Sequence, residues 1–284
     1  TRWIVVGPIT VQAAEPAKLF FFCYLSAYLV RRRDEVMDNF KGFIKPLVVF
    51  LLLAILLLRQ PDLGTIIVMF VTTFGLLFLA GARLWQFVGI ASMGVIALSL
   101  LAIFEPYRWR RVTSFLDPWQ DPFGSGYQLT QSLMAYGRGE VFGQGLGNSI
   151  QKLYFLPEAH NDFVLAIIGE ELGLVGVSLV VALFVLLVWL GFSIARKAEL
   201  QGQVYNSFVA YGISLLFAGQ ALINIGVNIG LLPTKGLTLP FLSQGGASLI
   251  VCCFMAAILI RIQYETEFAD ADSAQSIWPW KQGD

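Results

Sequence analysis

Two residues that could do acid–base chemistry stand at the start of a long apolar run. The stretch YFLPEAHNDF, residues 154–163, holds the only histidine of the chain, His160, and, two positions later, Asp162. An aspartate at the water boundary of a membrane helix can reach a substrate whose reactive part is outside and whose anchor is in lipid. Such a position suits a general base, and His160 could orient it.

A structural role is the alternative for each of these residues. Asn161 or Asp162 could cap the helix that we expect to begin near Phe163, and capping is the commoner role of such residues. A lone histidine near a helix start is more often a hydrogen-bonded structural residue than a catalytic one. The residue types alone leave both interpretations open.

Two carboxylates follow inside the apolar run. Glu170 and Glu171 lie roughly 12 to 14 Å beyond Asp162 at the helical rise of about 1.5 Å per residue. Because a carboxylate inside a membrane is costly, at least one should face a polar cavity or a basic partner. The simpler role is a structural ion pair with Lys18 or Lys235, and the other is a contact with substrate.

Several basic and polar residues could bind an anionic substrate. EPYRWRRVTSF places Arg108, Arg110 and Arg111 beside the membrane, and guanidinium groups bind phosphate oxygens bidentately. Lys152 and Lys235 could add positive charge. Long loops also tolerate basic residues without any function, so an anion site is one of two interpretations.

A second pair of polar residues lies in the turn RQPDLGT. Gln60 and Asp62 could line the same cavity as Asp162. Asp62 is also typical of an ordinary helix cap after Pro61.

The elements that must position these residues are membrane helices. The chain has 57% hydrophobic and 13% charged residues, and its mean hydropathy is +0.70. These values indicate an integral membrane protein, because soluble domains are less apolar and more charged. The apolar segments are continuous and most approach the roughly 20 residues of a spanning helix, so we predict an all-α polytopic fold with about seven transmembrane helices. They lie near residues 17–30, 43–58, 63–80, 84–104, 163–192, 205–232 and 242–260.

The charge pattern predicts the orientation of these helices. Four basic connections fall on one side in a simple up-and-down count, and this side should be cytoplasmic. They are VRRRDEVMDNFKG, GARLWQ, IARKAELQ and IRIQYE. The long loop 105–162 then faces out. With a net charge of +0 and no long basic run, nothing indicates nucleic acid binding.

The loop 105–162 is longer than most structureless connections, so we expect it to be ordered and functional. YQLTQSLMAYGRG, residues 127–139, has helical spacing and a glycine at its end. The motif GQGLG at 143–147 follows no strand and is not a nucleotide fingerprint, which favours a loop that approaches a ligand. Cys23, Cys252 and Cys253 lie in apolar runs and predict neither a disulfide framework nor a metal site.

Seven motifs together closely resemble the SEDS family (shape, elongation, division and sporulation) of bacterial cell-wall polymerases. In chain order they are EPAK at 15–18, QPDLGT at 60–65, DPFGSGYQ at 121–128, GQGLGNS at 143–149, LPEAHNDF at 156–163, GEELG at 169–173 and LPTKGLTLPFLS at 232–243. Three segments are more similar in sequence to the division branch of the family than to its elongation branch. They are VQAAEPAKL, GRGEVFGQGLGNSIQKL and PTKGLTLP. Two departures are Asn161, where the family usually has Thr, and SQGGAS at 243–248, where it has SYGGSS.

The resemblance implies a fold of ten helices, of which the first three are missing from this sequence. It divides the chain into a membrane domain, 1–264, and a cytoplasmic C-terminal tail, 265–284. It further implies peptidoglycan glycosyltransferase activity on lipid II, with Asp162 as the catalytic aspartate. Ser243, at the end of the last motif, completes the set of expected substrate-binding residues.

The resemblance and the residue chemistry suggest one reaction. Asp162 accepts the proton from the 4-hydroxyl of the acceptor sugar as that oxygen attacks the anomeric carbon of the donor. Undecaprenyl pyrophosphate leaves and the centre inverts, so one base is enough. The basic residues, with a divalent cation such as Mg or Mn as a further candidate, would compensate the charge of the leaving group, and no organic cofactor is expected.

Two other classes of function remain as alternatives. A lipid II flippase would need polar groups along a path through the bilayer. Modest support for it comes from Glu170, Glu171, Asn224 and Asn228. A non-catalytic divisome scaffold would only bind partners. The resemblance itself implies a multi-pass protein of the bacterial inner membrane at the division septum. Its implied partners are a class B penicillin-binding protein of the FtsI type and a subcomplex of the FtsQ–FtsL–FtsB type.

Overall fold

The computed structural model describes residues 3–6, 9–60, 62–82, 84–104, 115–234 and 236–276. Four of the expected substrate-binding residues lie outside the described residues, namely Arg108, Arg110, Arg111 and Lys235.

Long helices form most of the described chain, and they correspond one by one to the predicted apolar segments. They are α1 (Ala14–Arg31), α3 (Phe40–Arg59), α4 (Leu63–Leu79), α5 (Leu84–Ile103), α8 (Val164–Leu200), α9 (Val204–Asn228) and α10 (Gly246–Ser276). The predicted all-helical membrane fold is therefore confirmed. The shorter elements are the strands β1 (Trp3–Val6) and β2 (Ile9–Gln12), the helices α2 (Arg33–Asp38) and α7 (Tyr127–Gly139), and the π-helix η1 (Gln151–Phe155). The sequence did not indicate the antiparallel hairpin of β1 and β2, in which Val6 pairs with Ile9.

Four helices among the described residues are long and apolar enough to cross a membrane, and they are α3, α8, α9 and the part of α10 up to Phe268. Helix α4 is an equally apolar but shorter helix. Continuous apolar sequence must form helices in lipid, because no water is present there to satisfy the backbone polar groups. The protein is a membrane protein.

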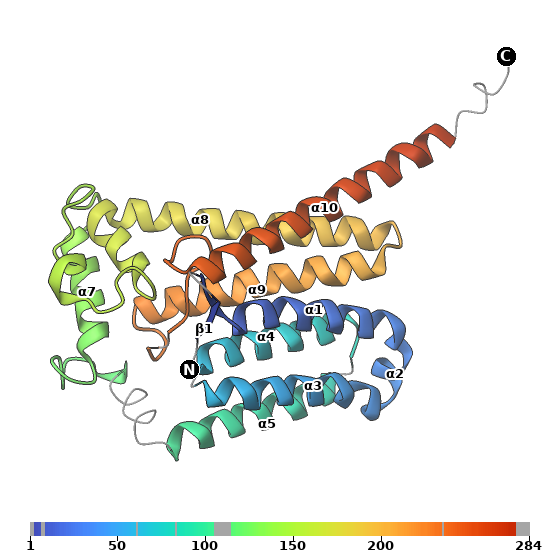
Figure 1. Cartoon of the computed structure of the whole chain (residues 1–284), viewed down its shortest axis with the longest axis horizontal. Helices are drawn as coiled ribbons and strands as arrows, with labels where there is room; N and C mark the ends of the chain where they lie inside the picture. Colours follow the sequence, from blue (N-terminus) through green and yellow to red (C-terminus); the bar gives the residue numbers. More distant parts are fainter. Residues whose placement is uncertain are drawn as a thin grey trace.

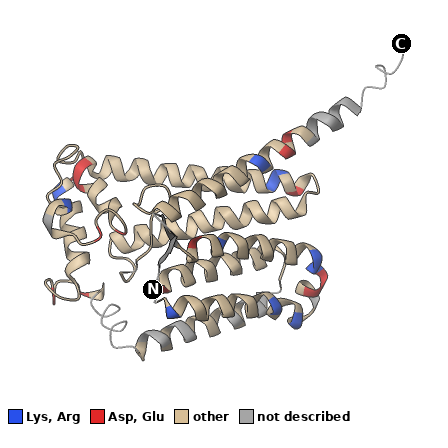
Figure 2. Ribbon diagram, in the orientation of Figure 1, with Lys and Arg blue, Asp and Glu red and all other residues tan. Residues whose placement is uncertain are grey.

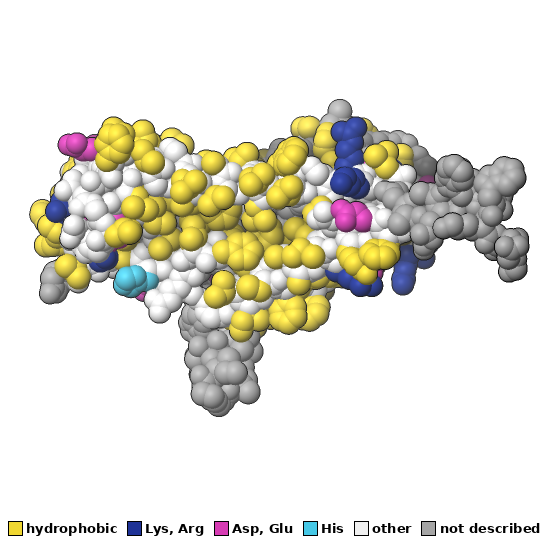
Figure 3. Space-filling view, turned by 90° about the horizontal axis from the view of Figure 1, so that it is seen from above, with side chains coloured by type: hydrophobic (Ala, Val, Ile, Leu, Met, Phe, Trp, Pro, Cys, Tyr) yellow, Lys and Arg dark blue, Asp and Glu magenta, His cyan; other side chains and the backbone are white. Residues whose placement is uncertain are grey.

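The long helices run side by side, so that the molecule has two ends (Figure 1). The α2 end carries the connection from α1 to α3 and the turn between α8 and α9. The α7 end carries α7 and the connection from α9 to α10. Lys, Arg, Asp and Glu gather near the two ends, while the middle is largely uncharged (Figure 2). Apolar side chains cover much of that middle in the view of Figure 3. This distribution matches a bilayer around the middle, with water at each end.

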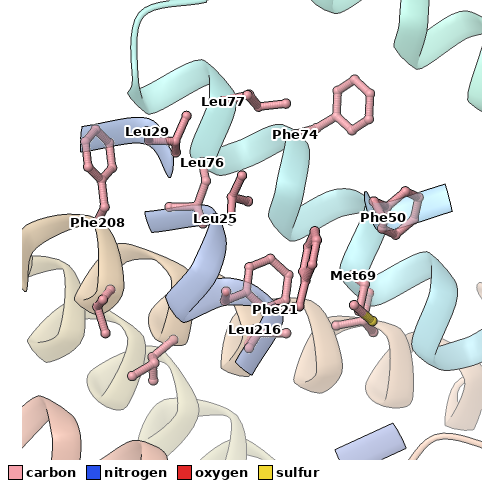
Figure 4. Packing of buried hydrophobic residues seen from close by; sticks show 14 of the residues in the cluster. Phe21, Leu25, Leu29, Phe50, Met69, Phe74, Leu76, Leu77, Phe208 and Leu216 are labelled. Atoms are coloured by element: carbon pink, nitrogen blue, oxygen red, sulfur yellow. The ribbon is translucent and has the colours of Figure 1, made fainter. Parts of the chain in front are cut away.

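The main core lies where α1, α3, α4 and α9 meet (Figure 4). Phe21 and Leu25 of α1 pack among Phe50 of α3, Met69 of α4 and Leu216 of α9, and each of these side chains is at most 9% exposed. Close packing of this kind holds helices together in lipid, where apolar side chains gain little from leaving the solvent.

A second, smaller core lies at the α7 end. Ala135 of α7, Phe163 and Ala166 at the start of α8, and Val227 of α9 pack together there. Helix α7 covers residues 127–139 as the sequence predicted, and it joins this core instead of lying free in the loop. The described part of the loop, residues 115–162, therefore forms a layer over the ends of α8 and α9.

Helix α8 is too long to lie wholly within a bilayer. Its 37 residues span about 55 Å at 1.5 Å per residue, against a hydrocarbon core of about 30 Å. A break at Gly173, with φ 66° and ψ −162°, separates its first turns from the rest. The first turns belong to the layer at the α7 end.

The predicted boundary between the membrane domain and the tail, at residue 264, falls within a helix. Helix α10 runs without interruption from Gly246 to Ser276. The separate tail stays a prediction.

Candidate active site at the start of helix α8

Asp162 lies in a compact turn between η1 and α8. The Glu158 carbonyl accepts the backbone N–H groups of Asn161 at 3.0 Å and Asp162 at 3.1 Å, and Glu158 itself has a positive φ of 58°. Phe163 and Ala159 anchor the turn in the second core. Asp162 is half-buried between that core and the surface.

The interpretation of Asn161 or Asp162 as the cap of α8 is wrong. The cap position is Phe163, whose side chain cannot cap the helix. The Ala166 N–H, one of the groups that a cap would satisfy, donates to the Phe163 carbonyl at 3.0 Å and to Asn228 Oδ1 of α9 at 3.2 Å. Asn161 donates its amide to the Glu158 carboxylate. The first turn of α8 therefore has acceptors on both Phe163 and Asn228.

Two buried asparagines of α9 hold the backbone of Asp162. Asn224 Nδ2 and Asn228 Nδ2 each donate to the Asp162 carbonyl at 2.9 Å. Asn224 Nδ2 also donates to the Leu237 carbonyl at 2.6 Å. These bonds fasten the turn to a membrane helix and tie it to the segment that follows α9.

That segment, residues 236–245, lies directly against the turn. The Gln244 N–H donates to the His160 carbonyl at 2.8 Å, and Ser243 Oγ donates to the Asn161 carbonyl. A Cβ atom at Gly236 would stand 3.2 Å from Asp162 Oδ2, so glycine leaves the carboxylate room there. The structure thus brings together Asp162, His160 and Ser243, three of the residues that the sequence singled out.

His160 and Ser243 have different surroundings within this site. The His160 side chain is exposed (His is cyan in Figure 3). Ser243 is only 8% exposed and also accepts the Leu239 N–H at 2.7 Å. Ser243 therefore joins the segment 236–245 to the turn of Asp162. The side chain of His160 points to the surface instead.

Glu170 is buried in a structural ion pair, with a partner that the sequence did not indicate. Its carboxylate is fully buried and accepts Arg138 Nη1 of α7 at 2.6 Å. It also accepts Ser149 Oγ and the backbone N–H groups of Ile150 and Gln151, both at 3.2 Å. Glu170 thereby joins the loop to α8 through four hydrogen-bond donors.

Lys152 and Lys18 pair with carboxylates other than Glu170. Lys235, the other lysine considered as a partner of Glu170, lies outside the described residues. Lys152 Nζ pairs with Glu171, so this lysine is neutralised by the neighbouring carboxylate. Lys18 pairs with Glu15 of its own helix at 2.9 Å, where both side chains are at most 6% exposed. The expected pairing of Glu170 with Lys18 is wrong, although an ion pair for Glu170 was the right kind of contact.

Asp62 is a helix cap, one of the two roles that the sequence allowed. Its carboxylate accepts the Thr65 N–H at 3.1 Å and Thr65 Oγ1 at 2.8 Å, at the start of α4. Gln12 of β2 donates to the same carboxylate at 3.3 Å. Gln60 is the C-cap residue of α3 and lies two positions before Asp62.

Tyr136 of α7 packs against Gly169, the residue before Glu170. A Cβ atom at Gly169 would approach the Tyr136 ring to 2.5 Å, so the two residues are in close contact. Burial raises the pKa of the Tyr136 phenol, which therefore stays neutral near pH 7. Among the described residues its hydroxyl has no hydrogen-bond partner. These features indicate packing, not acid–base chemistry.

No three His, Cys, Asp or Glu side chains within the described parts of the chain lie together as metal ligands. Asp62 is already occupied by its cap, and Glu170 by its four donors. These residues do not fit a metal centre held by the protein alone.

The sequence reasoning missed the residues that support Asp162. Asn224 and Asn228 were assigned to a transport path, and Arg138 and Gly236 were not singled out. The spacing of the asparagines by four residues in an apolar helix was the available signal. It puts two amides on one face, where each needs a partner.

Comparison with known proteins gives the chain a family. The model of the cell cycle protein family FtsW, RodA and SpoVE matches residues 1–268. A probable peptidoglycan glycosyltransferase FtsW of Alteromonas naphthalenivorans is 63% identical over 265 residues, which make up 93% of this chain and 52% of that protein. A protein of the same description from Escherichia coli O6:H1 is 56% identical over 273 residues, covering 96% of this chain and 66% of that protein. The chain therefore spans about half the length of the first of these relatives.

Two solved structures share the fold. One, described as the structural coordination of polymerization and crosslinking by a peptidoglycan synthase complex, has a chain that matches with a TM-score of 0.76 and 27% identity, over 93% of this chain and 73% of that chain. The rod shape determining protein RodA of Thermus thermophilus matches with a TM-score of 0.65 and 26% identity, over 93% of this chain and 69% of that chain.

Proposed function

The chain belongs to the FtsW, RodA and SpoVE family of cell cycle proteins, and on that premise we propose that it is part of a peptidoglycan glycosyltransferase that polymerises lipid II into β-1,4 glycan strands. The resemblance to the SEDS family is thereby confirmed. The relatives from Alteromonas and Escherichia carry the description of peptidoglycan glycosyltransferase, which supports the activity.

The observation that carries the proposal is how the backbone of Asp162 is held and where its carboxylate lies. Its backbone is held by two buried asparagines, and one of them, Asn228, also accepts an N–H group from the first turn of α8. Its carboxylate lies beside Gly236 at the α7 end. A carboxylate positioned there can take the proton from the 4-hydroxyl of an acceptor sugar while the lipid anchor stays in the bilayer. Attack opposite the departing pyrophosphate inverts the anomeric centre, and the reaction then needs no second carboxylate as nucleophile.

The leaving pyrophosphate needs positive charge, and two nearby cations of the described chain are already paired. Arg138 serves Glu170, and Lys152 serves Glu171. We therefore assign the pyrophosphate to Arg108, Arg110, Arg111 and Lys235. A divalent cation would need the pyrophosphate itself for ligands, and we assign no step to it.

The flippase alternative loses its main support. Asn224 and Asn228 donate to the carbonyl groups of Asp162 and Leu237, so they do not line a free polar path. A scaffold that only binds division partners would not require the ordered surroundings of Asp162. A polymerase accounts both for these surroundings and for the hydrogen bonds from Asn224 and Asn228 to the Asp162 carbonyl.

The proposal extends to partners and location. A relative in a complex that polymerises and crosslinks peptidoglycan supports a crosslinking partner here, which would be a class B penicillin-binding protein of the FtsI type. The FtsW relatives favour a place at the division septum of the inner membrane, with a subcomplex of the FtsQ–FtsL–FtsB type as a further partner.

The test is glycan polymerisation from purified lipid II by the full-length protein with its penicillin-binding partner, whose transpeptidase is disabled. Asp162→Asn keeps the size of the side chain but removes the base, so we expect a loss of at least 10²-fold, on the order of a missing general base. Asp162→Ala should be equally inactive.

The matched control is Asp117→Asn. Asp117 is an exposed carboxylate of the same loop, and its Oδ1 accepts the Trp119 N–H, a bond that asparagine can retain. This variant should polymerise like the wild type. Normal polymerisation by a folded Asp162→Asn protein would remove the proposed base and return transport or scaffolding to consideration.

A further inference from the structure

Two polar side chains in the last turns of α9 are buried. Asn224 and Asn228 are 1% and 0% exposed, and they lie four residues apart on one face of an otherwise apolar helix. A buried amide costs free energy unless it is hydrogen-bonded, and its partners are therefore informative. The partners of this pair converge on one residue of another element, Asp162.

Asn228 makes two kinds of contact with the chain around Asp162. Its Oδ1 accepts the Ala166 N–H, which belongs to the first turn of α8. Its Nδ2 donates to the Asp162 carbonyl and to Asn224 of its own helix. One side chain thus fixes both Asp162 and the helix that follows it.

The contact with Ala166 also affects the Asp162 carboxylate indirectly. A helix start needs acceptors for its N–H groups, and an aspartate just before the helix is a usual source. Asn228 supplies an acceptor from a different helix, beside the Phe163 carbonyl, which accepts the same Ala166 N–H at 3.0 Å. By fixing the start of α8 directly after Asp162, this contact helps to place the carboxylate, whose Oδ2 lies 3.2 Å from the position of a Cβ atom on Gly236.

Asn224 links the turn of Asp162 to the segment that follows α9. Its Nδ2 bridges the Asp162 carbonyl and the Leu237 carbonyl, at 2.9 and 2.6 Å. The spacing between the turn of Asp162 and the segment that begins at Gly236 therefore depends on this amide. Because both asparagines lie on a packed membrane helix, they are rigid supports for a turn with no regular structure of its own.

We infer that Asn228 and Asn224 are positioning residues of the glycosyl transfer, which hold the Asp162 carboxylate in its reactive place by fixing its backbone and capping α8. This inference rests on the proposed function. Neither amide needs to touch substrate, so their loss should lower kcat much more than it raises KM.

The experiment measures kcat and KM for lipid II with the full-length protein and its partner, together with amide hydrogen exchange of the peptide covering residues 158–168. Asn228→Ala removes the cap and the bond to Asp162. Displacing a catalytic group by about 1 Å costs on the order of 10²-fold. We therefore expect a kcat loss of that order, a KM close to that of the wild type, and faster exchange in the peptide.

Asn228→Asp is the second variant, because it keeps the volume and the acceptor for Ala166 but lacks the amide donor. It should keep the start of α8 protected and still lose kcat, since an oxygen now faces the Asp162 carbonyl. Asn224→Ala should lose kcat with the α8 cap intact.

The control is Gln220→Ala. Gln220 lies on α9 one turn before Asn224 and is also buried, at 2% exposed. Among the described residues its Oε1 has no hydrogen-bond partner. It should leave both kcat and the exchange unchanged.

The inference is overturned by a wild-type kcat in folded Asn228→Ala and Asn228→Asp proteins, by unchanged exchange at residues 158–168, or by an equal loss in the Gln220 control. If the wild type forms no glycan at all, the proposed function fails instead. The exchange data then decide separately whether the asparagines hold this segment.

Discussion

At the scale of single residues, the Glu170 carboxylate holds the layer over the membrane helices together. It is fully buried and joins α8 to Arg138 of α7 and to the loop residues 149–151. A buried carboxylate is tolerated only when its charge and its lone pairs are satisfied. The described part of the loop therefore depends on one buried side chain of α8.

Arg138→Gln tests this dependence. The change leaves Glu170 buried without its cation and should destabilise the folded protein by about 3 kcal/mol, the lower end of the range for a broken buried pair. The lower end applies because the Arg138 side chain is itself 37% exposed. Thermal or denaturant unfolding in detergent measures the effect.

The control for this change is Arg261→Gln. Arg261 pairs with Glu265 four residues later on α10, and its side chain is 67% exposed. Exposed pairs contribute only about 0 to 1 kcal/mol, so this variant should unfold almost like the wild type. If the two variants lost the same free energy of unfolding, the ion pair of Glu170 with Arg138 would contribute no more than an exposed pair.

At the scale of elements, the break in α8 is repaired by the loop. Helical hydrogen bonds are lost at Gly173, and the segment 140–145 replaces them. The Gln144 and Gly145 N–H groups donate to the Glu170 and Glu171 carbonyls at 3.0 and 2.9 Å. In return, Leu174 N–H donates to the Glu140 carbonyl at 3.0 Å. The loop and the first turns of α8 thus form one unit, which carries Asp162 at its edge.

Gly173→Ala should disrupt this unit. The backbone at Gly173 has φ 66° and ψ −162°, a region that is essentially restricted to glycine and costs other residues about 1 to 3 kcal/mol. A Cβ atom would also stand 2.4 Å from the Val141 carbonyl oxygen, which makes the upper end of that range the expected loss. The free energy of unfolding and the proteolysis of the loop are the measurements.

Gly137→Ala is the matched control on α7. Nothing lies within 4 Å of a Cβ atom at Gly137, and the residue is inside a helix. Alanine should therefore be neutral or stabilise the protein by up to about 1 kcal/mol. If Gly173→Ala were as harmless as Gly137→Ala, the loop would not depend on the break.

At the scale of the whole molecule, the α7 end and the α2 end should lie on opposite sides of one membrane. Basic connections gather at the α2 end, including Arg196 and Lys197 near the end of α8, and this bias predicts that the α2 end is cytoplasmic. The site around Asp162 is at the other end. The α7 end, which carries Asp162, would then be the outer end, and the proposed substrate is on that side of the membrane.

Single cysteines test the orientation, in a background that lacks Cys23, Cys252 and Cys253. Phe142→Cys reports on the α7 end and Leu200→Cys on the α2 end, at positions that are 83% and 79% exposed. A membrane-impermeant maleimide should label position 142 in spheroplasts and position 200 only after the membrane is opened. The reverse pattern would put Asp162 in the cytoplasm and exclude the proposed reaction.

What the sequence determined by itself was local in character. Apolar runs predicted the long helices because a backbone in lipid must satisfy its own hydrogen bonds. The spacing in residues 127–139 predicted α7, and Asp62 caps α4 through Thr65, only three residues away. The motifs indicated the family and with it Asp162. Each of these inferences uses contacts within a few residues or a property of a whole segment.

Only the tertiary structure decided how Asp162 is held. Asn228 caps α8 from 62 residues away, and Arg138 meets Glu170 across 32 residues. Several acceptors and cations in the sequence could have made these contacts, among them Asp162 for the cap and Lys18 for the ion pair. Distance along the chain does not choose between them, because the choice depends on which faces of α7, α8 and α9 pack together.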